Sequence, residues 1–343
     1  MAFSSGKNVA KFSGSQRVVL ITGCSAGGIG HCLALEFAKS GCKVYASARN
    51  ISKVDTELSR KGIELVELDV TDNMSVDAAV NQILRNEGRI DVLVNNAGIS
   101  ISGPVVEVDV SKVQQAMDTN FTGCVRVTHA VAPHMMDRRR GVIVNVGSVV
   151  GYAAMPWLGY YAASKAALHA MTDAMRMELA PFNVHVVVLA PGTIKSNISS
   201  SREEGKLLAD DSRYISIIGP LSHLSSIFHD NAWATDKFVQ KVVPQILSDQ
   251  PRAYISYGGG SVSAWMMYFA PPWIRDALLS RKFGVQKLTE ILAVRGTGSK
   301  RSFMRVASRR PAVWASLVSV IVAAILYGNP GLRSRIIGLF IKQ

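Results

Sequence analysis

The sequence predicts an α/β protein built on a doubly wound parallel sheet, followed by a basic helical tail. Short apolar segments rich in β-branched residues alternate with apolar-periodic segments of helical length, which is the pattern of a sheet with helices on both faces. The composition changes after Pro272. Residues 273–343 hold 13 of the 38 Lys and Arg residues but only 2 of the 25 Asp and Glu residues, so the tail is basic and the body is close to neutral.

The first element expected is a buried strand at Arg17–Thr22, which reads RVVLIT. It leads through the glycine-rich turn GCSAGGIG into a helix that ends at Gly41. Further strands are expected at Lys43–Ser47, Ile63–Val70, Ile90–Asn95, Gly141–Val146 and Val184–Leu189, and the clearest helices at Ser75–Asn86, Val113–Met136 and Tyr161–Glu178. After a loop over Thr193–Ser216, a helix near Thr235–Leu247 and a strand near Arg252–Tyr257 close the domain.

The glycine-rich turn from Thr22 to Gly30 is suited to a dinucleotide. Glycine lets the backbone approach a pyrophosphate closely, and the N-terminus of the following helix offers N–H groups and a positive dipole. The second strand ends with Arg49 and without an acidic residue. Since a guanidinium fits the extra phosphate of NADP, we expect NADP(H). The alternatives are a tight turn without a ligand and an Arg49 that is only a solvated charge.

The stretch GYYAASK suggests acid–base chemistry. Tyr161 and Lys165 are four residues apart, which places them on one face of a helix, whereas Tyr160 has Ser164 at that offset. An ammonium lowers the pKa of a neighbouring phenol, so that the phenol can serve as an acid or base near neutral pH. A surface pair without function is the alternative.

Several motifs, in order, resemble those of the classical short-chain dehydrogenase/reductase family over roughly residues 15–260. They are the turn at Thr22–Gly30, Asp69 in LDVTD, Asn95-Asn96-Ala97-Gly98, Asn120, Ser148 and Tyr161 (13 positions apart), Lys165, and Pro191-Gly192-Thr193-Ile194. The resemblance implies a Rossmann fold, a carbonyl reductase or alcohol dehydrogenase activity, and a catalytic tetrad of Asn120, Ser148, Tyr161 and Lys165.

The resemblance also implies a role for each residue of the tetrad. Tyr161 protonates the substrate oxygen as hydride arrives, Lys165 lowers the pKa of Tyr161 and holds the nicotinamide ribose, Ser148 aligns the carbonyl, and Asn120 holds a water. The cofactor-binding residues that it implies are Gly23, Ser25, Gly28, Ile29, Gly30, Arg49, Asp69, Asn96, Arg126, Tyr161, Lys165, Ile194 and Ser196. A structural or surface role for Arg126 is equally open.

One departure concerns the glycine turn. The family usually has three residues between its TG and GIG, and this chain has four, Cys24-Ser25-Ala26-Gly27. Whether Gly27 or Gly28 takes the central role is open. No metal site is expected, because the four cysteines form no metal-binding pattern, and we interpret them as reduced.

We divide the chain into an N-terminal extension (1–14), a catalytic domain (15–262), an amphipathic basic segment (263–310) and an apolar membrane-anchoring segment (311–343). Residues 264–291 alternate large apolar and basic side chains, as interfacial helices do, although the segment could instead pack on its own domain or a second subunit. The uncharged run Ala312–Tyr327 would form a helix of about 24 Å, short for a bilayer core of ~30 Å. A short spanning helix, a re-entrant hairpin and a buried soluble helix are all open.

The basic run Lys300–Arg310 predicts on which side of a membrane the catalytic domain lies. By the positive-inside rule this run stays in the cytosol, so we expect a catalytic domain that faces the cytosol at the endoplasmic reticulum or a lipid droplet. A nucleic-acid partner is not expected, since an apolar run follows the basic one directly.

The segments ITGCSAGGIGHCLALEFA and PWIRDALLSRKFGVQKL resemble fungal NADPH-dependent 1-acyldihydroxyacetone-phosphate reductases. This resemblance implies reduction of a lipophilic keto-phosphate to 1-acylglycerol 3-phosphate. The alternatives are a ketoreductase of steroid, retinoid or secondary metabolism and, more remotely, a non-catalytic membrane-bound protein that binds NADPH. A homodimer or homotetramer is implied by the family resemblance.

Overall fold

The computed structural model of the chain describes residues 16–196, 208–217 and 231–294. The chain divides into two compact units, residues 1–268 and 269–343. The first unit contains the sheet and all the predicted site residues. The division falls slightly beyond the boundary expected at residue 262.

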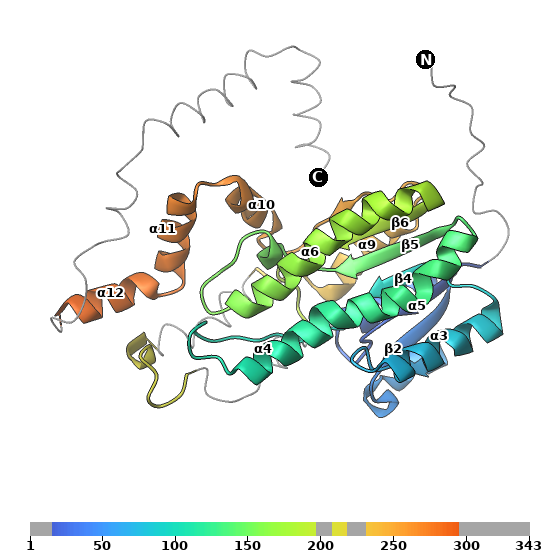
Figure 1. Cartoon of the computed structure of the whole chain (residues 1–343), viewed down its shortest axis with the longest axis horizontal. Helices are drawn as coiled ribbons and strands as arrows, with labels where there is room; N and C mark the ends of the chain where they lie inside the picture. The colour runs from blue at the N-terminus through green and yellow to red at the C-terminus, as the bar shows by residue number, and fades with distance from the viewer. Residues whose placement is uncertain (1–15, 197–207, 218–230, 295–343) are drawn as a thin grey trace, which may run out of the picture. The chain divides into compact units, whose positions relative to one another are not determined.

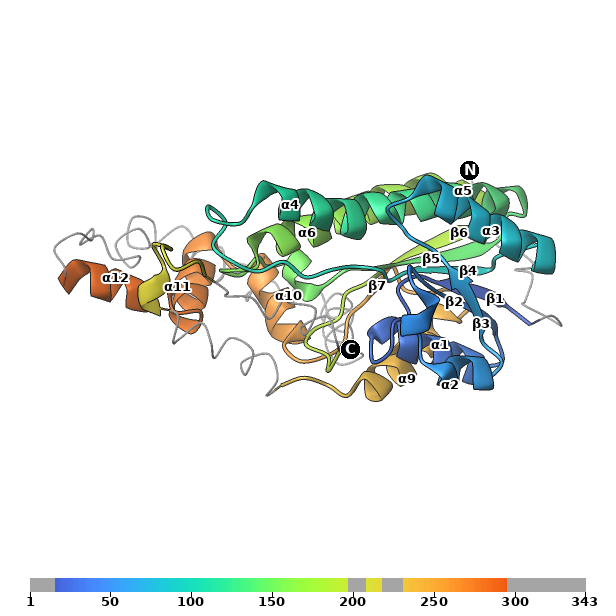
Figure 2. The same cartoon turned by 90° about the horizontal axis from the view of Figure 1, so that it is seen from below.

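A parallel sheet of seven strands forms the centre of the first unit (Figures 1 and 2). The strands lie in the order β3-β2-β1-β4-β5-β6-β7, and every neighbouring pair is parallel. This confirms the predicted doubly wound sheet. The strands are β1 (Val18–Ile21), β2 (Lys43–Ala48), β3 (Glu64–Glu67), β4 (Val92–Asn95), β5 (Gly141–Val146), β6 (Val184–Leu189) and β7 (Tyr254–Ile255).

Helices cover both faces of the sheet (Figure 2). On one face lie α1 (Ile29–Lys39), α2 (Thr56–Arg60) and α9 (Thr235–Ile246), and on the other α3 (Asn73–Glu87), α4 (Val110–Met117), α5 (Gly123–Asp137) and α6 (Gly159–Leu179). Strand side chains alternate between the two cores: Val19 and Ile21 belong to the α1 and α9 side, and Val18 and Leu20 to the α3 and α5 side. Burial on both faces explains why the strands read as continuous apolar runs.

Two predicted helices are divided in the structure. The helix expected at Val113–Met136 consists of α4 and α5 joined by a π-helical turn at Asp118–Thr122. The segment expected to be one amphipathic helix, 264–291, contains α10 (Ser261–Phe269), α11 (Pro272–Lys282) and α12 (Val285–Val294). Proline is favoured in the first turn of a helix and cannot continue a preceding one, so Pro272 begins α11.

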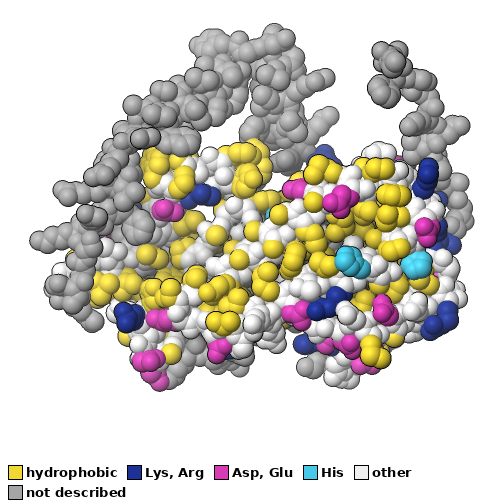
Figure 3. All heavy atoms as spheres, viewed as in Figure 1, with side chains coloured by type: hydrophobic (Ala, Val, Ile, Leu, Met, Phe, Trp, Pro, Cys, Tyr) yellow, Lys and Arg dark blue, Asp and Glu magenta, His cyan; other side chains and the backbone are white. Residues whose placement is uncertain are grey.

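Hydrophobic side chains cover much of the face over α4, α5 and α6 (Figure 3). Val110 on α4 and Met177 on α6 are among the exposed ones. Within the described residues, no helix has both the length and the apolar character needed to cross a bilayer. The predicted N-terminal extension, the basic run and the apolar segment 311–343 lie outside those residues.

Candidate active site

The glycine turn joins β1 to α1, and Gly27 and Gly28 differ in backbone conformation. Gly27 has a φ of +72°, a left-handed conformation that favours glycine, whereas Gly28 has a φ of −86° and is the N-cap of α1. The two glycines that sequence alone left undecided therefore have different tasks. Gly27 turns the chain and Gly28 begins the helix.

A clamp of hydrogen bonds holds this turn against the end of β4. The buried Thr22 Oγ1 accepts hydrogen bonds from the backbone N–H groups of Asn96 and Ala97, both at 3.0 Å. The Asn96 side-chain amide donates in return to the carbonyls of Thr22 (2.8 Å) and Gly23 (3.0 Å). Asn96 thus holds the glycine turn in place through the carbonyls of Thr22 and Gly23.

The backbone packs closely across the turn. A Cβ at Gly23 would lie 2.7 Å from Ala97 Cα, and one at Gly30 would lie 2.6 Å from the Gly23 carbonyl oxygen. No side chain caps the N-terminus of α1, and its first turn carries no acidic residue. An anion would therefore meet backbone donors and a positive dipole here.

The residues predicted for the adenosine end occupy the ends of β2 and β3. Arg49 is exposed immediately after β2. The half-buried Asp69 carboxylate accepts hydrogen bonds from the Thr71 N–H (2.9 Å) and hydroxyl (2.7 Å). Arg126 forms an ion pair with Asp118 at 2.8 Å, which is the structural role that the sequence left open for it.

Lys165, the charged member of the predicted tetrad, is buried, with 3% of its surface exposed. Its Nζ donates a hydrogen bond of 2.8 Å to the Val146 carbonyl at the end of β5, and lies 5.9 Å from the centre of the Tyr161 ring. Burial lowers the pKa of Lys165 to about 8. The neighbouring Tyr160 points its hydroxyl elsewhere, to the Val105 carbonyl at 3.0 Å.

Asn120 lies in the π-helical turn and is fully buried. Its Oδ1 accepts from the Ile99 N–H at 2.8 Å, and its Nδ2 donates to the Ile99 carbonyl at 2.9 Å and to Ser164 Oγ at 3.0 Å. A Cβ at Gly98 would be 3.2 Å from Asn120 Oδ1 and 3.5 Å from Lys165 Nζ. The amide and the ammonium therefore converge on Gly98, at the end of the NNAG motif.

Ser148 lies in the turn that follows β5. It is half-buried and caps the short 3₁₀ turn Val149–Gly151, its Oγ accepting from the Val150 N–H at 3.3 Å. Ile194, also predicted to contact the cofactor, pairs with Trp233 in a parallel bridge, and Ser196 follows two residues later. The predicted residues thus come from the carboxyl ends of the strands and the helices that follow them, where open α/β sheets bind ligands.

Comparison with known proteins decides the family. Residues 17–207, more than half of the chain, match the family model described as short chain dehydrogenase. The chain belongs to this family. It is therefore an oxidoreductase.

Three relatives of this short-chain dehydrogenase show how far the similarity extends. The NADPH-dependent 1-acyldihydroxyacetone phosphate reductase of Schizosaccharomyces pombe is 41% identical over 187 residues, 54% of this chain and 62% of that reductase. The short-chain dehydrogenase ptmH of Penicillium ochrochloron is 33% identical over 79% of this chain and 99% of its own length. The solved structure titled "ElxO with NADP Bound" is 28% identical and superposes with a TM-score of 0.59, covering 73% of this chain and all of that one.

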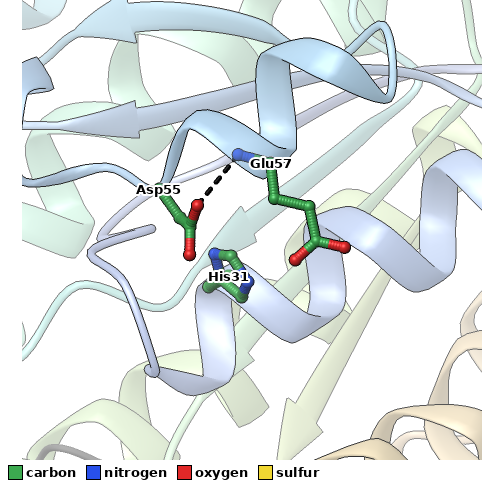
Figure 4. A group of neighbouring side chains, drawn as sticks. All are labelled: His31, Asp55 and Glu57. Carbon is green, nitrogen blue, oxygen red and sulfur yellow. Dashed lines mark hydrogen bonds between the residues drawn. The ribbon is translucent and has the colours of Figure 1, made fainter.

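The structure also groups three side chains that the sequence did not connect. His31 on α1 lies beside Asp55 and Glu57 at the start of α2, and their potential ligand atoms are within 4.8 Å of one another (Figure 4). One Asp55 oxygen already accepts a hydrogen bond from the Glu57 N–H at 2.9 Å, as the N-cap of α2. Asp55 is exposed, and we assign no metal to this group.

Proposed function

We propose that the dehydrogenase reduces a lipophilic ketone with NADPH, and that the ketone is 1-acyldihydroxyacetone phosphate, which becomes 1-acylglycerol 3-phosphate. The observation that carries the reductase assignment is the convergence of buried Lys165 and Asn120 at Gly98, with Tyr161 one helical turn from Lys165. This arrangement places a buried cation near a half-buried phenol, so the positive charge can stabilise the phenolate that forms when Tyr161 gives up its proton.

The residues fit a dinucleotide. The close-packed glycine turn and the uncapped N-terminus of α1 suit a pyrophosphate, and the exposed Arg49 at the end of β2 suits an additional phosphate. The fission yeast relative is named as NADPH-dependent, and the ElxO structure is titled as having NADP bound. When bound, NADPH supplies the hydride.

The proposed chemistry follows from where negative charge develops. As the carbonyl carbon gains a hydride, its oxygen becomes an alkoxide, and Tyr161 gives that oxygen its phenolic proton. Lys165 stabilises the resulting phenolate by its positive charge, and the Ser148 hydroxyl donates to the same substrate oxygen. Asn120 holds the Ile99 backbone and Ser164 beside them, which keeps the site rigid.

Two observations bear on the substrate. The 41% identity to the fission yeast reductase favours an acylated keto-phosphate, but this chain covers only 62% of that protein. The match to ptmH extends over 99% of that dehydrogenase, whose name includes no substrate. Family membership therefore also allows the second candidate, a ketone without phosphate such as a steroid, retinoid or secondary metabolite.

A substrate panel separates the two candidates. NADPH oxidation by the detergent-purified full chain is measured with 1-acyldihydroxyacetone phosphate, its dephosphorylated form and a set of hydrophobic ketones. The proposal predicts turnover of the phosphorylated lipid and at least tenfold lower kcat/KM for the dephosphorylated form. A preference for ketones without phosphate would favour the second candidate.

We also propose that the dehydrogenase works at a membrane or lipid-droplet surface, with the catalytic unit facing the cytosol. Its support is α10, where Val262, Trp265, Met266 and Tyr268 are 40–66% exposed, an unusual density of large apolar groups for a water-facing helix. The test is flotation of the full chain with liposomes that contain anionic lipid. Replacing Trp265 and Met266 by Ser should weaken binding to the liposomes. The control, Met74→Ser at an exposed position on α3, should leave this binding unchanged. Equal binding by all variants would contradict a role for α10.

A homodimer or homotetramer remains a proposal as well. The exposed apolar residues on α4 and α6 suit a subunit contact on that face (Figure 3). Light scattering of the purified chain would test this, and a monomer at micromolar concentration would contradict it.

A further inference from the structure

His169 connects two elements that carry proposed catalytic residues, helix α6 and the turn after β5. It lies on α6 one turn after Lys165, and its ring is buried beneath the turn that carries Ser148. The backbone N–H of Ser148 donates a hydrogen bond to His169 Nε2 at 3.3 Å. One side chain of α6 therefore contacts the main chain of a proposed catalytic residue that comes from a different element.

The turn around Ser148 has room for this ring only because of its glycines. A Cβ at Gly147 would lie 2.0 Å from His169 Nε2, and a Cβ at Gly151 would lie 2.7 Å from Cε1. The Tyr152 ring covers the imidazole further, with ring centres 4.8 Å apart. Gly147 and Gly151 flank Ser148 on either side, so the turn is shaped to close over the histidine.

The charge state of His169 agrees with this hydrogen bond. Burial and the nearby Lys165 lower the pKa of His169 to about 4, against a smaller opposite effect of Asp173. The ring is therefore neutral at physiological pH. Since Nε2 accepts a hydrogen bond, the network assigns the ring proton to Nδ1.

We propose that His169 is a positioning residue: by holding the Ser148 backbone through Nε2, it directs the Ser148 hydroxyl toward the carbonyl oxygen of the substrate. This inference rests on the proposed function, in which Ser148 donates to that oxygen. His169 itself need not touch the substrate or the cofactor. It links the turn after β5 to the helix that carries Tyr161 and Lys165, so that the donors keep one relative geometry.

The test is a double-mutant cycle between Ser148→Ala and His169→Leu, with NADPH oxidation of 1-acyldihydroxyacetone phosphate, or of the panel ketone that is turned over, as the readout. Misplacement of a donor predicts that His169→Leu alone lowers kcat about 10- to 100-fold, with little change in the Kd of NADPH. Because the histidine acts through the serine, the same substitution should cost less than about threefold in the Ser148→Ala background. Equal losses in both backgrounds would overturn the proposal.

Two further variants separate positioning from general structural damage. His169→Gln carries an amide oxygen that can accept from the Ser148 N–H, and it should recover most of the lost turnover. His185→Leu on β6 is the matched control, a half-buried histidine on another element, and it should keep wild-type kcat. Should His169→Gln be as impaired as His169→Leu, hydrogen bonding to Ser148 is not what the residue provides.

A crystal structure of the His169→Leu variant provides a readout that needs no substrate. The proposal predicts a Ser148 hydroxyl displaced or reoriented relative to wild type, and an unmoved Ser148 would contradict it. The kinetics also show which claim has failed. If Ser148→Ala retains full turnover, the proposed role of Ser148 is wrong, whereas an impaired Ser148→Ala with additive losses counts against His169 alone.

Discussion

Burial of the Lys165 ammonium, a proposed catalytic group, lowers the stability of the fold. This ammonium is almost fully buried and donates a hydrogen bond to the Val146 carbonyl at 2.8 Å. Removing a charge from water is unfavourable unless it is fully compensated, and this is why burial lowers its pKa from 10.5 to about 8. A shift of that size corresponds to about 3 kcal/mol of destabilisation when the lysine is charged.

Lys165→Met should therefore stabilise the protein near pH 7 while removing activity. We expect the free energy of unfolding to rise by about 1–3 kcal/mol, since a buried charge is replaced by a chain of similar volume. Between pH 8 and 10.5 the unfolded state holds more protons at this site than the folded state, so wild-type stability rises with pH. The gap between variant and wild type should shrink across this range.

Thermal unfolding of both proteins at pH 7 and pH 10 measures this gap. Asp137→Asn, a change at an exposed residue at the end of α5, serves as the control and should show a similar difference from wild type at both values. A Lys165→Met variant that is less stable than wild type at pH 7 would show that the buried ammonium is better compensated than its surroundings indicate.

The sequence predicted a tetrad, but it could not predict the side chains that hold the members of this tetrad in place. Spacing placed Tyr161 and Lys165 on one helical face, and the structure does so. The contact between His169 and the Ser148 backbone spans 21 residues and depends on the exact fold of a turn, so no local periodicity indicates it. Likewise, the sequence left a cofactor contact and a structural or surface role open for Arg126, and it did not indicate the ion pair with Asp118.

The turn after β1 packs closely against α1, and this packing requires glycine, which has no side chain. Gly30 lies against the Gly23 carbonyl, and the Asn96 amide donates a hydrogen bond to the same carbonyl. A methyl group at Gly30 would displace the turn that is proposed to bind the pyrophosphate.

Gly30→Ala should weaken NADPH binding at least tenfold, because its Cβ would lie 2.6 Å from the Gly23 oxygen and 2.5 Å from Asn96 Nδ2. The matched control is Gly88→Ala at the C-cap of α3, where φ is +70° and the added Cβ meets no atom within 4 Å. That control should lose about 1 kcal/mol of stability with unchanged NADPH affinity. Fluorescence titration with NADPH measures both, and equal affinities for the two variants would count against this turn as the cofactor site.

Element types followed from the sequence better than element continuity did. The strands at Gly141–Val146 and Val184–Leu189 match their predicted bounds, since apolar β-branched runs have few other solutions. The π-helical turn at Asp118–Thr122 was missed, because its apolar period continues through it. Its cause is tertiary: Asn120 bonds to Ile99 and Ser164 rather than facing along the helix.

At the scale of the whole molecule, the first unit contains a complete set of proposed catalytic and cofactor residues. The second unit, residues 269–343, contains the part of the sequence in which Lys and Arg far outnumber Asp and Glu. The fold could be predicted because two features of the sequence agree: the family motifs occur in their usual order, and strands alternate with helices. The substrate could not, since the pocket of this fold varies between proteins that share its catalytic residues.

The central claim is that Tyr161 delivers the proton in an NADPH-dependent ketone reduction. The most direct measurement is steady-state NADPH oxidation by wild type, Tyr161→Phe and Tyr160→Phe, with 1-acyldihydroxyacetone phosphate and the ketone panel, alongside NADPH titrations. We expect that Tyr161→Phe lowers kcat at least ~100-fold with NADPH still bound, while Tyr160→Phe, which loses only a hydrogen bond to the Val105 carbonyl, stays within a few-fold of wild type. Full turnover by Tyr161→Phe would contradict it.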